Sequence, residues 1–527
     1  ENLYTCSQDT QEKIKEMIKE HNLNRVVVAS CTPRTHEPLF QNTIKEAGLN
    51  PYLFEMANIR DQCSWIHMHE IDGATKKAKD LVRMAVAKAR LLEPLENLTI
   101  DVDQQALVIG GGATGMVAAL ELAKQGMKVH LVEREIELGG NMRKLHYLTS
   151  GEDPSKLAEA LSKEVNSNSN IKVHMQTSVK SIDGYVGNFK TTLDNGERVE
   201  HGVVILAVGG QEYKPKGEYL YGVNPNVLTL LEFKEKLKKD EIDGDSYVFI
   251  QCVGSREEGY PNCSRVCCTG TMTAAIKIKK KSPDAKVFVL FRDIRTYGFR
   301  EAYYKEAADS GVTFVRFEDD VRPIVRGTEN KLGVAVTDED TGKEITLTAD
   351  YLILASGTRP YAESEALAPM LKVPMTKEGF FLEAHMKLRP VDFATEGVYL
   401  AGLSHGPKFL EESIGQGLAA VSRAMTILSK KTLEAEGIVA NLDETLCDGC
   451  GICVPTCEYK ALEIIIDKKD EKKKLVDVNV GLCKGCGACV GACPSGALTQ
   501  KGFRDEQIVA MIDAALESTT EEQEVRQ

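Results

Sequence analysis

The sequence lacks any apolar run long enough to cross a membrane. No segment reaches the roughly 18 consecutive apolar residues that a transmembrane helix requires. A surplus of positive charge is also missing, because 78 Asp and Glu residues outnumber 65 Lys and Arg residues and leave a net charge of −13. Proteins that bind nucleic acids usually carry a basic surface. We therefore expect neither a membrane span nor a nucleic-acid interface.

The chain also lacks an initiator methionine and a charged-then-apolar signal peptide at its start. We expect the N-terminal domain to be incomplete. Cysteine, in contrast, is plentiful, with 15 among the 527 residues. Without secretory features, this predicts cysteines that hold metal clusters in a reducing cytoplasm, and not a disulfide framework.

Eight cysteines form two quartets near the C-terminal end. Each quartet has the spacing C-x2-C-x2-C-x3-C, and Pro494 directly follows the last cysteine. This is the ligand pattern of a bacterial ferredoxin with two [4Fe-4S] clusters, in which the fourth cysteine of each run binds the other cluster. We therefore predict one cluster on Cys447, Cys450, Cys453 and Cys493, and a second on Cys483, Cys486, Cys489 and Cys457.

Zinc sites and disulfide bonds are the alternative uses of these cysteines. Zinc usually takes two separate CxxC pairs and not two unbroken quartets, so the spacing favours iron–sulfur clusters. Glycines at positions 449, 451, 485 and 487 allow the backbone to approach inorganic sulfur closely. The C-terminal module is therefore predicted to transfer single electrons.

Near residue 106 the pattern becomes that of a dinucleotide-binding unit. A buried strand runs into a glycine turn with Gly110, Gly112 and Gly115, a helix follows, and the next strand ends at Glu133. The glycines permit a tight turn that places a pyrophosphate at the helix N-terminus, and the acid binds ribose hydroxyls. A glycine-rich connection without a nucleotide is the alternative, but the complete βαβ unit favours a nucleotide site.

The glutamate followed by a second glycine turn resembles the FAD-binding segment of disulfide-reductase-type flavoproteins. Residues 397–402 resemble their second FAD motif, although Leu403 stands where the family often has an acid. The helix predicted for 411–425 would direct its N-terminus at the flavin. The predicted cofactor-binding residues are Gly110, Gly112, Ala113, Thr114, Gly115, Glu133, Arg134, Gly139, Gly140, Asn141, Gly209, Gly357, Gly402, Leu403, Ile414 and Gly415.

Residues 220–349 show the strands and helix of a second nucleotide domain, but they lack its glycine fingerprint. In thioredoxin-reductase relatives this domain binds NADPH. Here the turn after strand 246–251 carries four cysteines instead, and we interpret them as ligands of a third [4Fe-4S] cluster. A purely structural cysteine group is the alternative, because adjacent cysteines are not a standard ligand pair. The four are Cys252, Cys263, Cys267 and Cys268.

The first 97 residues are predicted to form a small α/β domain. Cys31 and Cys63 fall in its expected loops, where such folds bind ligands, and Cys6 precedes its first helix. A further cluster on these three cysteines is a hypothesis, and buried, small apolar side chains are the alternative. The expected elements are a helix at 10–22, a strand at 25–30, a loop at 31–40, a helix at 41–47, a strand near 52–56 and a helix at 72–92.

Taken together, these segments resemble the A subunit of heterodisulfide reductase over nearly the whole chain. The resemblance implies a thioredoxin-reductase-like α/β core with two dinucleotide-type domains, FAD and several [4Fe-4S] clusters. Methanogen members often carry a further ferredoxin domain within the FAD domain, and this chain has none there. The segments that carry the resemblance are Tyr4–Ser7, Ala29–Glu37, Cys63–His67, the glycine turn, Gln251–Arg256, Cys263–Cys268, Gly406–Lys408 and the two quartets.

The resemblance also implies partners and an activity. The partners are B and C type subunits, ferredoxin, and a donor module that is a hydrogenase, a formate dehydrogenase or a flavin-containing protein, in a dimer of cytoplasmic complexes. FAD would divide electron pairs between ferredoxin and a disulfide-reducing partner, by bifurcation or confurcation. A non-bifurcating conduit stays open as an alternative, and the missing fingerprint argues against an NAD(P)H-dependent reductase.

Lys408 and His405 lie beside the second FAD motif and are candidates for tuning the flavin potential. Ordinary solvated loop residues are the alternative for both. The domains we expect are 1–97 (N-terminal α/β), 98–219 with 350–431 (FAD-binding), 220–349 (second nucleotide-type domain), 432–503 (ferredoxin) and 504–527 (helix and tail).

Overall fold

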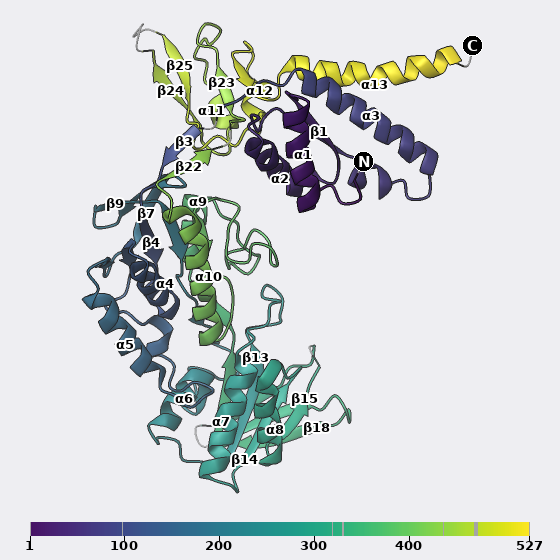
Figure 1. Ribbon diagram of the computed structural model, residues 1–527. Helices are drawn as coiled ribbons and strands as arrows, with labels where there is room; N and C mark the ends of the chain where they lie inside the picture. The colour runs from purple at the N-terminus through teal and green to yellow at the C-terminus, as the bar shows by residue number, and fades with distance from the viewer. Residues whose placement is uncertain are drawn as a thin grey trace. The chain divides into compact units, whose positions relative to one another are not determined.

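The computed structural model describes residues 2–96, 98–318, 320–328, 331–435, 437–467 and 473–525. The chain forms two compact units, which we call the terminal unit (residues 1–100 and 434–527) and the central unit (residues 101–433) (Figure 1). Strands β3 (Leu98–Asp101) and β22 (Thr432–Ala435) fall where the sequence passes from one unit to the other. Among helices of the described ranges, none combines the length and apolar character needed to span a bilayer.

Two parallel sheets of five strands each build the central unit, in the orders β21-β10-β4-β5-β6 and β12-β19-β13-β14-β15. Strand β10 is buried along its whole length, as expected for parallel strands covered on both faces. The first sheet contains β4 (Gln105–Ile109), β5 (Lys128–Val132), β6 (Ile171–His174), β10 (Val203–Leu206) and β21 (Val398–Leu400), and the second contains β12 (Val227–Thr229), β13 (Ser246–Val253), β14 (Lys286–Phe291), β15 (Thr313–Arg316) and β19 (Tyr351–Ser356).

A three-stranded antiparallel sheet accompanies each parallel sheet, so the two halves of the central unit repeat one architecture. This confirms the predicted core of two dinucleotide-type domains. The first small sheet is β7 (Val179–Tyr185), β8 (Asn188–Leu193) and β9 (Arg198–His201), the second is β16 (Ile324–Thr328), β17 (Lys331–Thr337) and β18 (Glu344–Ala349), and β11 (Gln211–Glu212) pairs with β20 (Thr358–Arg359).

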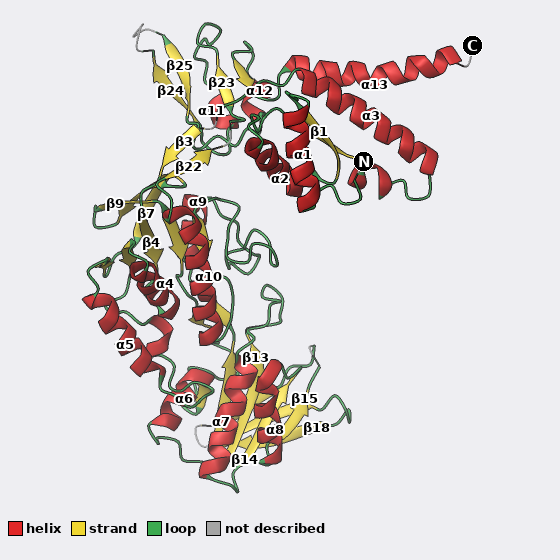
Figure 2. Ribbon diagram, in the orientation of Figure 1, coloured by secondary structure: helices red, strands yellow, loops and turns green. Residues whose placement is uncertain are grey.

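Helices accompany the strands of both sheets (Figure 2). Against the first sheet, Met116 and Leu122 are fully buried with Leu131 in one apolar core, where truncation of such a side chain to Ala costs about 2–5 kcal/mol. The helices are α4 (Ala113–Lys124), α5 (Pro154–Ser167), α6 (Leu230–Lys238), α7 (Cys267–Lys281), α8 (Glu301–Asp309), α9 (Ser364–Leu371) and α10 (Leu410–Leu428), with short turns η2 (Gly140–Arg143), η3 (Gly298–Arg300) and η4 (Gly402–Ser404).

The terminal unit combines the two ends of the chain. Gln507 of the last helix donates from Nε2 to the Leu91 carbonyl oxygen (3.0 Å), and Arg504 pairs with Glu93 (2.7 Å). The elements are α1 (Gln8–Glu20), β1 (Val26–Ser30), α2 (Pro33–Glu46), β2 (Phe54–Asn58), η1 (Arg60–Ser64), α3 (Ile71–Arg90), β23 (Ala440–Leu442), α11 (Cys453–Thr456), β24 (Leu462–Ile466), β25 (Lys474–Val478), α12 (Ala488–Ala492), β26 (Leu498–Gln500) and α13 (Asp505–Val525).

The loop expected at residues 31–40 is wrong, because helix α2 already begins at Pro33. Proline fits the first helical position, where its missing N–H has no intrahelical partner to lose. Pro38 does remove one internal hydrogen bond. Burial of Phe40 (1% exposed) and Ile44 (0%) against the β1–β2 pair offsets that cost, a tertiary contribution that proline content does not reveal.

Candidate functional site

A cleft lies at the carboxyl ends of β4, β5 and β10 in the central unit, with about 1210 Å³ of space between its lining atoms. Ligands of parallel sheets bind at this edge. Many of the predicted cofactor-binding residues line the cleft: Gly110, Gly112, Ala113, Thr114, Glu133, Arg134, Gly140, Asn141, Gly209 and Leu403.

The three glycines of the first turn differ in what they make possible. A Cβ on Gly110 would lie 2.3 Å from the Ala207 carbonyl oxygen, and one on Gly115 would lie 1.8 Å from that of Gly110. The fold itself requires these two glycines. At Gly112 a Cβ would meet no atom within 4 Å, so the space beside the N-terminus of α4 stays open. This opening fits the pyrophosphate of a dinucleotide.

Glu133 lies at the end of β5 and is buried. Its Oε2 accepts from the Gly111 N–H at 2.7 Å, and its Oε1 accepts from the Glu135 N–H at 2.8 Å. Each carboxylate oxygen keeps a further lone pair, so the side chain is held rigidly and can still accept from ribose hydroxyls. The Arg134 guanidinium stacks on the Tyr361 ring at 3.9 Å on the same wall.

Six predicted cofactor residues do not line this cleft. Gly139 donates its N–H to the Gly111 carbonyl oxygen (2.9 Å) and supports the turn from behind. Gly357 packs against Ser255 and Ser264 of the cysteine-bearing turn. The sequence patterns missed Tyr361, Leu410 and Ser413, which do line the cleft but belong to no spacing pattern. The six are Gly115, Gly139, Gly357, Gly402, Ile414 and Gly415.

Lys408 lines the cleft beside Leu403. Its Nζ donates to the carbonyl oxygens of Gly402 (2.7 Å) and Gly406 (3.1 Å). Burial, assisted by the charge of Arg265, lowers the pKa of Lys408 to about 8. The ammonium is therefore a half-buried cation beside the second FAD motif, and a neighbouring anion would stabilise it.

His405 sits in the same loop but is absent from the cleft wall. Its Nε2 lies 2.8 Å from Glu383 Oε2, its Nδ1 lies 2.9 Å from Gln416 Nε2, and Gln416 Oε1 accepts from the Gly402 N–H (3.0 Å). Burial lowers the pKa of His405. The imidazole therefore orients Gly402 through Gln416.

A second cleft, with about 1490 Å³ of space, continues from the first. The second reaches Cys267 at the start of α7, and the two share Asn141, Lys144, Leu145, Leu403, Lys408 and Leu410. The turn with four cysteines therefore lies beside the end of the nucleotide cleft where the second FAD motif is.

The cysteine-bearing turn has a strained backbone. Cys252, Arg256 and Arg265 have φ values of 62°, 57° and 56°, a region that costs side-chain-bearing residues energy and recurs at ligand sites. Burial raises the pKa of Cys252 to about 11. A hydrogen bond from Cys267 lowers the pKa of Cys268 to about 7 and raises that of Cys267. The structure brings the four cysteines together.

Arginines surround this turn and favour a negatively charged occupant. Arg256 pairs with Asp293 (2.9 Å), and its charge contributes to the lowered pKa of Cys268. The Arg265 N–H donates to Cys263 Sγ at 3.3 Å. Four thiolates with nearby cationic groups are a suitable donor set for a [4Fe-4S] cluster.

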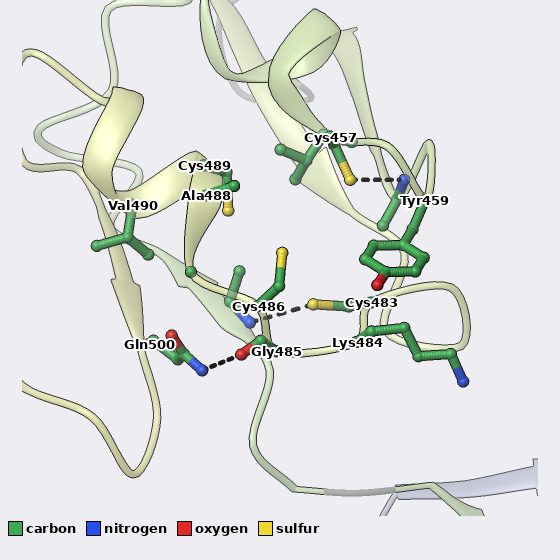
Figure 3. A pocket seen from close by; sticks show the side chains of 14 residues that line it. Cys457, Tyr459, Cys483, Lys484, Gly485, Cys486, Ala488, Cys489, Val490 and Gln500 are labelled. Atoms are coloured by element: carbon green, nitrogen blue, oxygen red, sulfur yellow. Dashed lines mark hydrogen bonds between the residues drawn. The ribbon is translucent and has the colours of Figure 1, made fainter. Parts of the chain in front are cut away.

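In the terminal unit, Cys457, Cys483, Cys486 and Cys489 line one pocket (Figure 3). Burial raises the pKa of Cys489 to about 11, and the other three sulfurs contribute. Backbone N–H groups of Ala461 and Ala440 donate to the sulfurs of Cys457 (3.3 Å) and Cys483 (3.4 Å). Such donors tune the reduction potential of a cluster. Four cysteine sulfurs around one pocket are the ligand set of a [4Fe-4S] cubane.

The other quartet gathers in the same way. Burial raises the pKa of Cys453, and the nearby sulfurs of Cys493, Cys450 and Cys447 raise it further. Both groups therefore take their fourth cysteine from the other run, as the spacing predicts. Across the described ranges, no three His, Cys, Asp or Glu side chains are grouped so that they could hold a single metal ion.

The three N-terminal cysteines differ in exposure: Cys6 is exposed, Cys31 half-buried and Cys63 buried. Cys31 Sγ accepts from Arg60 Nη1 at 2.9 Å, and the charge of Cys6 also acts on that guanidinium. Cys63 is buried in η1, at 2% exposure. A cluster on these residues stays a prediction.

Comparison with known proteins defines the class first. Residues 104–402 match the pyridine nucleotide-disulphide oxidoreductase family, and residues 446–497 match the 4Fe-4S dicluster domain. The chain is therefore an oxidoreductase with FAD and [4Fe-4S] clusters as cofactors. A solved thioredoxin reductase from T. acidophilum aligns with 61% of this chain and 97% of its own, at 18% identity and a TM-score of 0.45.

Two relatives place the chain more narrowly. The A subunit of the H(2):CoB-CoM heterodisulfide,ferredoxin reductase of Methanothermobacter thermautotrophicus is 38% identical over 97% of this chain and 91% of its own. The iron-sulfur A subunit of the CoB--CoM heterodisulfide reductase of Methanocaldococcus jannaschii is 35% identical over 98% and 93%. The chain belongs to the family of heterodisulfide reductase A subunits.

Proposed function

We propose that this chain is the electron-transfer subunit of a heterodisulfide-reductase-type complex, in which electron pairs are divided at FAD between ferredoxin and a disulfide-reducing partner. The relative from M. thermautotrophicus is named for H2, a heterodisulfide and ferredoxin, which supports this pair of acceptors. We further propose B and C type subunits and a hydrogenase, formate dehydrogenase or flavin-containing donor as partners, in a dimer of cytoplasmic complexes.

One observation carries the proposal: a continuous cavity joins the nucleotide cleft at Leu403 and Lys408 to Cys267. Bound FAD supplies the ability to accept electrons in pairs and release them singly. One electron-transfer branch would begin at a cluster held by Cys252, Cys263, Cys267 and Cys268. The other branch would use the clusters of the two C-terminal quartets.

The protein's part is to set the reduction potentials along the two electron-transfer branches that leave FAD. Lys408 would stabilise negative charge near Leu403, because its half-buried ammonium bonds to two carbonyl oxygens and to no carboxylate among the described residues. His405 and Gln416 would hold the backbone of Gly402 in place. Three clusters predict about twelve irons per chain, and a further N-terminal cluster about sixteen.

The test is a reconstituted complex, supplied with donor and with both acceptors or each alone. We expect ferredoxin to be reduced only while the high-potential acceptor is also present. Ferredoxin reduction without that acceptor would instead identify a simple conduit through FAD and the clusters.

A variant sharpens the test. Cys457→Ala should interrupt the ferredoxin branch, and in a tightly coupled divider it should also slow reduction of the high-potential acceptor. The neighbouring Thr456→Ala, which changes an exposed hydroxyl, should leave both acceptors unaffected. A Cys457→Ala complex that reduces the high-potential acceptor at the normal rate would contradict the coupling.

A further inference from the structure

Lys234 of α6 is a buried cation without a counterion. Its side chain lies on the wall of the second cleft, and the residue is only 8% exposed. Its Nζ donates to Thr273 Oγ1 over a long 3.3 Å. Within the described residues, no carboxylate forms an ion pair with it. A charge removed from water needs an opposite charge or strong hydrogen bonds in compensation.

Tyr147, also on the wall of this cleft, is the second unsatisfied group. Its hydroxyl is buried and has no hydrogen-bond partner among the described residues. Its ring centroid lies 4.6 Å from Lys234 Nζ and 4.4 Å from Lys277 Nζ. Lys277 also lacks an ion pair within the described part of the chain. The ammonium of Lys234 lies on the cleft wall and that of Lys277, an exposed residue, lies outside it on the same ring, so the positive charge of this end of the cleft comes chiefly from Lys234.

The acids that line the cleft do not neutralise this end. Glu212 pairs with Lys214 (2.7 Å), Glu411 with Arg300, and Glu152 accepts from the Ser150 hydroxyl (3.1 Å). Each of these three carboxylates therefore already has a partner, and two of the partners, Lys214 and Arg300, lie off the wall. The positive charge near Tyr147 is thus a local property of the cavity.

Apolar side chains line the rest of this region. Leu145, Leu148, Leu230 and Leu231 stand on the cleft wall with Lys234, and the cavity continues to Leu403. A cavity with a charged end and apolar walls favours a ligand that has a group of opposite charge at one end and an apolar remainder.

Helix α6 fixes Lys234 in this position. The Thr229 hydroxyl accepts from the Glu232 N–H (3.4 Å), and the Glu232 carboxylate accepts from the Thr229 N–H (2.8 Å), a reciprocal cap that defines the first turn. Gly270 on α7 allows α6 to pack closely, since a Cβ there would stand only 3.0 Å from Leu230 Cδ2.

We propose that the second cleft binds a small organic anion, whose carboxylate or phosphate pairs with Lys234 and accepts from the Tyr147 hydroxyl. The apolar part of this ligand lies on the leucines and extends toward Leu403. The charged end lies outside the nucleotide cleft, since Tyr147 and Lys234 line the second cavity and not the first, whereas Leu145 and Leu403 line both. The anionic group would therefore bind beyond the nucleotide cleft, with its apolar part reaching the wall that the two cavities share.

The experiment is anaerobic titration calorimetry on the full chain with FAD and clusters in place. The probes are hexanoate, hexyl phosphate, inorganic phosphate and the neutral analogue 1-hexanol. We expect hexanoate or hexyl phosphate to bind at least about tenfold more tightly than 1-hexanol, because a charge-assisted pair contributes most of the affinity. The stronger of the two identifies the headgroup, and inorganic phosphate should bind more weakly than hexyl phosphate.

Two variants and a control locate the site. Lys234→Met should weaken binding of the preferred anion about tenfold or more, and Tyr147→Phe about threefold to tenfold, through loss of one donor. Lys163→Met, at an exposed lysine of α5, should have no effect. Bound anion should also shift the flavin absorbance bands, since the cavity ends at Leu403.

Equal affinity of the anions and 1-hexanol, or unchanged binding by Lys234→Met, would overturn the proposal. Should Lys234→Met fail to fold, Tyr147→Phe decides the matter, because it removes only a hydroxyl group.

Discussion

Arg265 donates from Nη2 to Glu412 Oε1 over 3.1 Å. The first residue stands between Cys263 and Cys267, and the second lies in the first turn of α10, beside the nucleotide cleft. Tyr297 strengthens the contact, because its hydroxyl donates to the same carboxylate (2.8 Å) and accepts from the arginine (2.9 Å). The cysteine-bearing turn is thereby tied to the helix at the end of the cleft.

This contact predicts a measurable coupling. We expect Arg265→Met and Glu412→Gln to show a coupling free energy of about 0.5–1 kcal/mol, which is modest because the arginine side chain is 42% exposed. The measurement is a double-mutant cycle in anaerobic urea unfolding, followed by flavin fluorescence. Strictly additive variants would show that the contact does not hold the turn.

The two C-terminal quartets predict a pattern of iron loss. Cys457→Ala should remove about four irons per chain, and adding Cys486→Ala should remove no more, because both sulfurs face one space. Cys457→Ala combined with Cys450→Ala should remove about eight. Iron analysis of anaerobically purified variants gives the count. The opposite pattern, in which the Cys457 and Cys450 losses fail to add, would assign Cys457 to the other cluster.

The first glycine turn predicts that two similar substitutions fail for different reasons. Gly110→Ala should destabilise the fold, because the new Cβ would press on the Ala207 carbonyl at a φ of 108°. Gly112→Ala should fold normally and bind FAD at least about tenfold more weakly, since the methyl group would stand only in the open cleft.

Flavin content and thermal unfolding of the two variants separate these effects. Gly73→Ala on α3, where the nearest atom is 3.8 Å away, serves as the control and should change neither flavin content nor FAD affinity. If Gly112→Ala bound FAD as tightly as the wild-type protein, the pyrophosphate could not lie in the space beside Gly112.

Lys408 predicts a pH dependence of stability. Its pKa is about 8 in the fold and about 10.4 in an unfolded chain, so between these values the unfolded state binds more protons. The contribution of Lys408 to the free energy of unfolding should therefore rise with pH by up to ~1.4 kcal/mol per unit. Lys234, with a pKa lowered to about 8 by burial, contributes in the same direction.

Urea unfolding between pH 8 and 10 provides the measurement. Lys408→Met should reduce the increase of the free energy of unfolding with pH by the contribution of one titrating group. Lys163→Met should leave this increase unchanged. If the free energy of unfolding of the wild-type protein fell from pH 8 to 10, with the same slope in Lys408→Met, the lowered pKa of Lys408 would be contradicted.

Local patterns in the sequence predicted much of the fold. Strand β5 has the predicted bounds, 128–132, because Val129 and Leu131 alternate with polar residues, and Val132 follows, in a short segment between a glycine and a glutamate. The quartet spacing predicted which cysteines gather. Helix α2 was missed because burial of Phe40 and Ile44 outweighs the local effect of two prolines.

Long-range contacts were beyond the reach of sequence reasoning. Nothing in the spacing predicts that Tyr361 stacks on Arg134, or that Lys234 and Tyr147 meet in a cleft, since the partners come from distant segments. The placement of Gly357 against Ser255 was missed for the same reason. Motifs specify the groups that touch a cofactor through backbone geometry, and they say little about the walls around it.

The assembly of the terminal unit from both ends of the chain bears on its synthesis. Helix α3 precedes the whole central unit in the chain, whereas α13, which packs on it, follows that unit. At about 5–20 residues per second, the face of α3 that α13 covers would therefore stay uncovered for many seconds during synthesis.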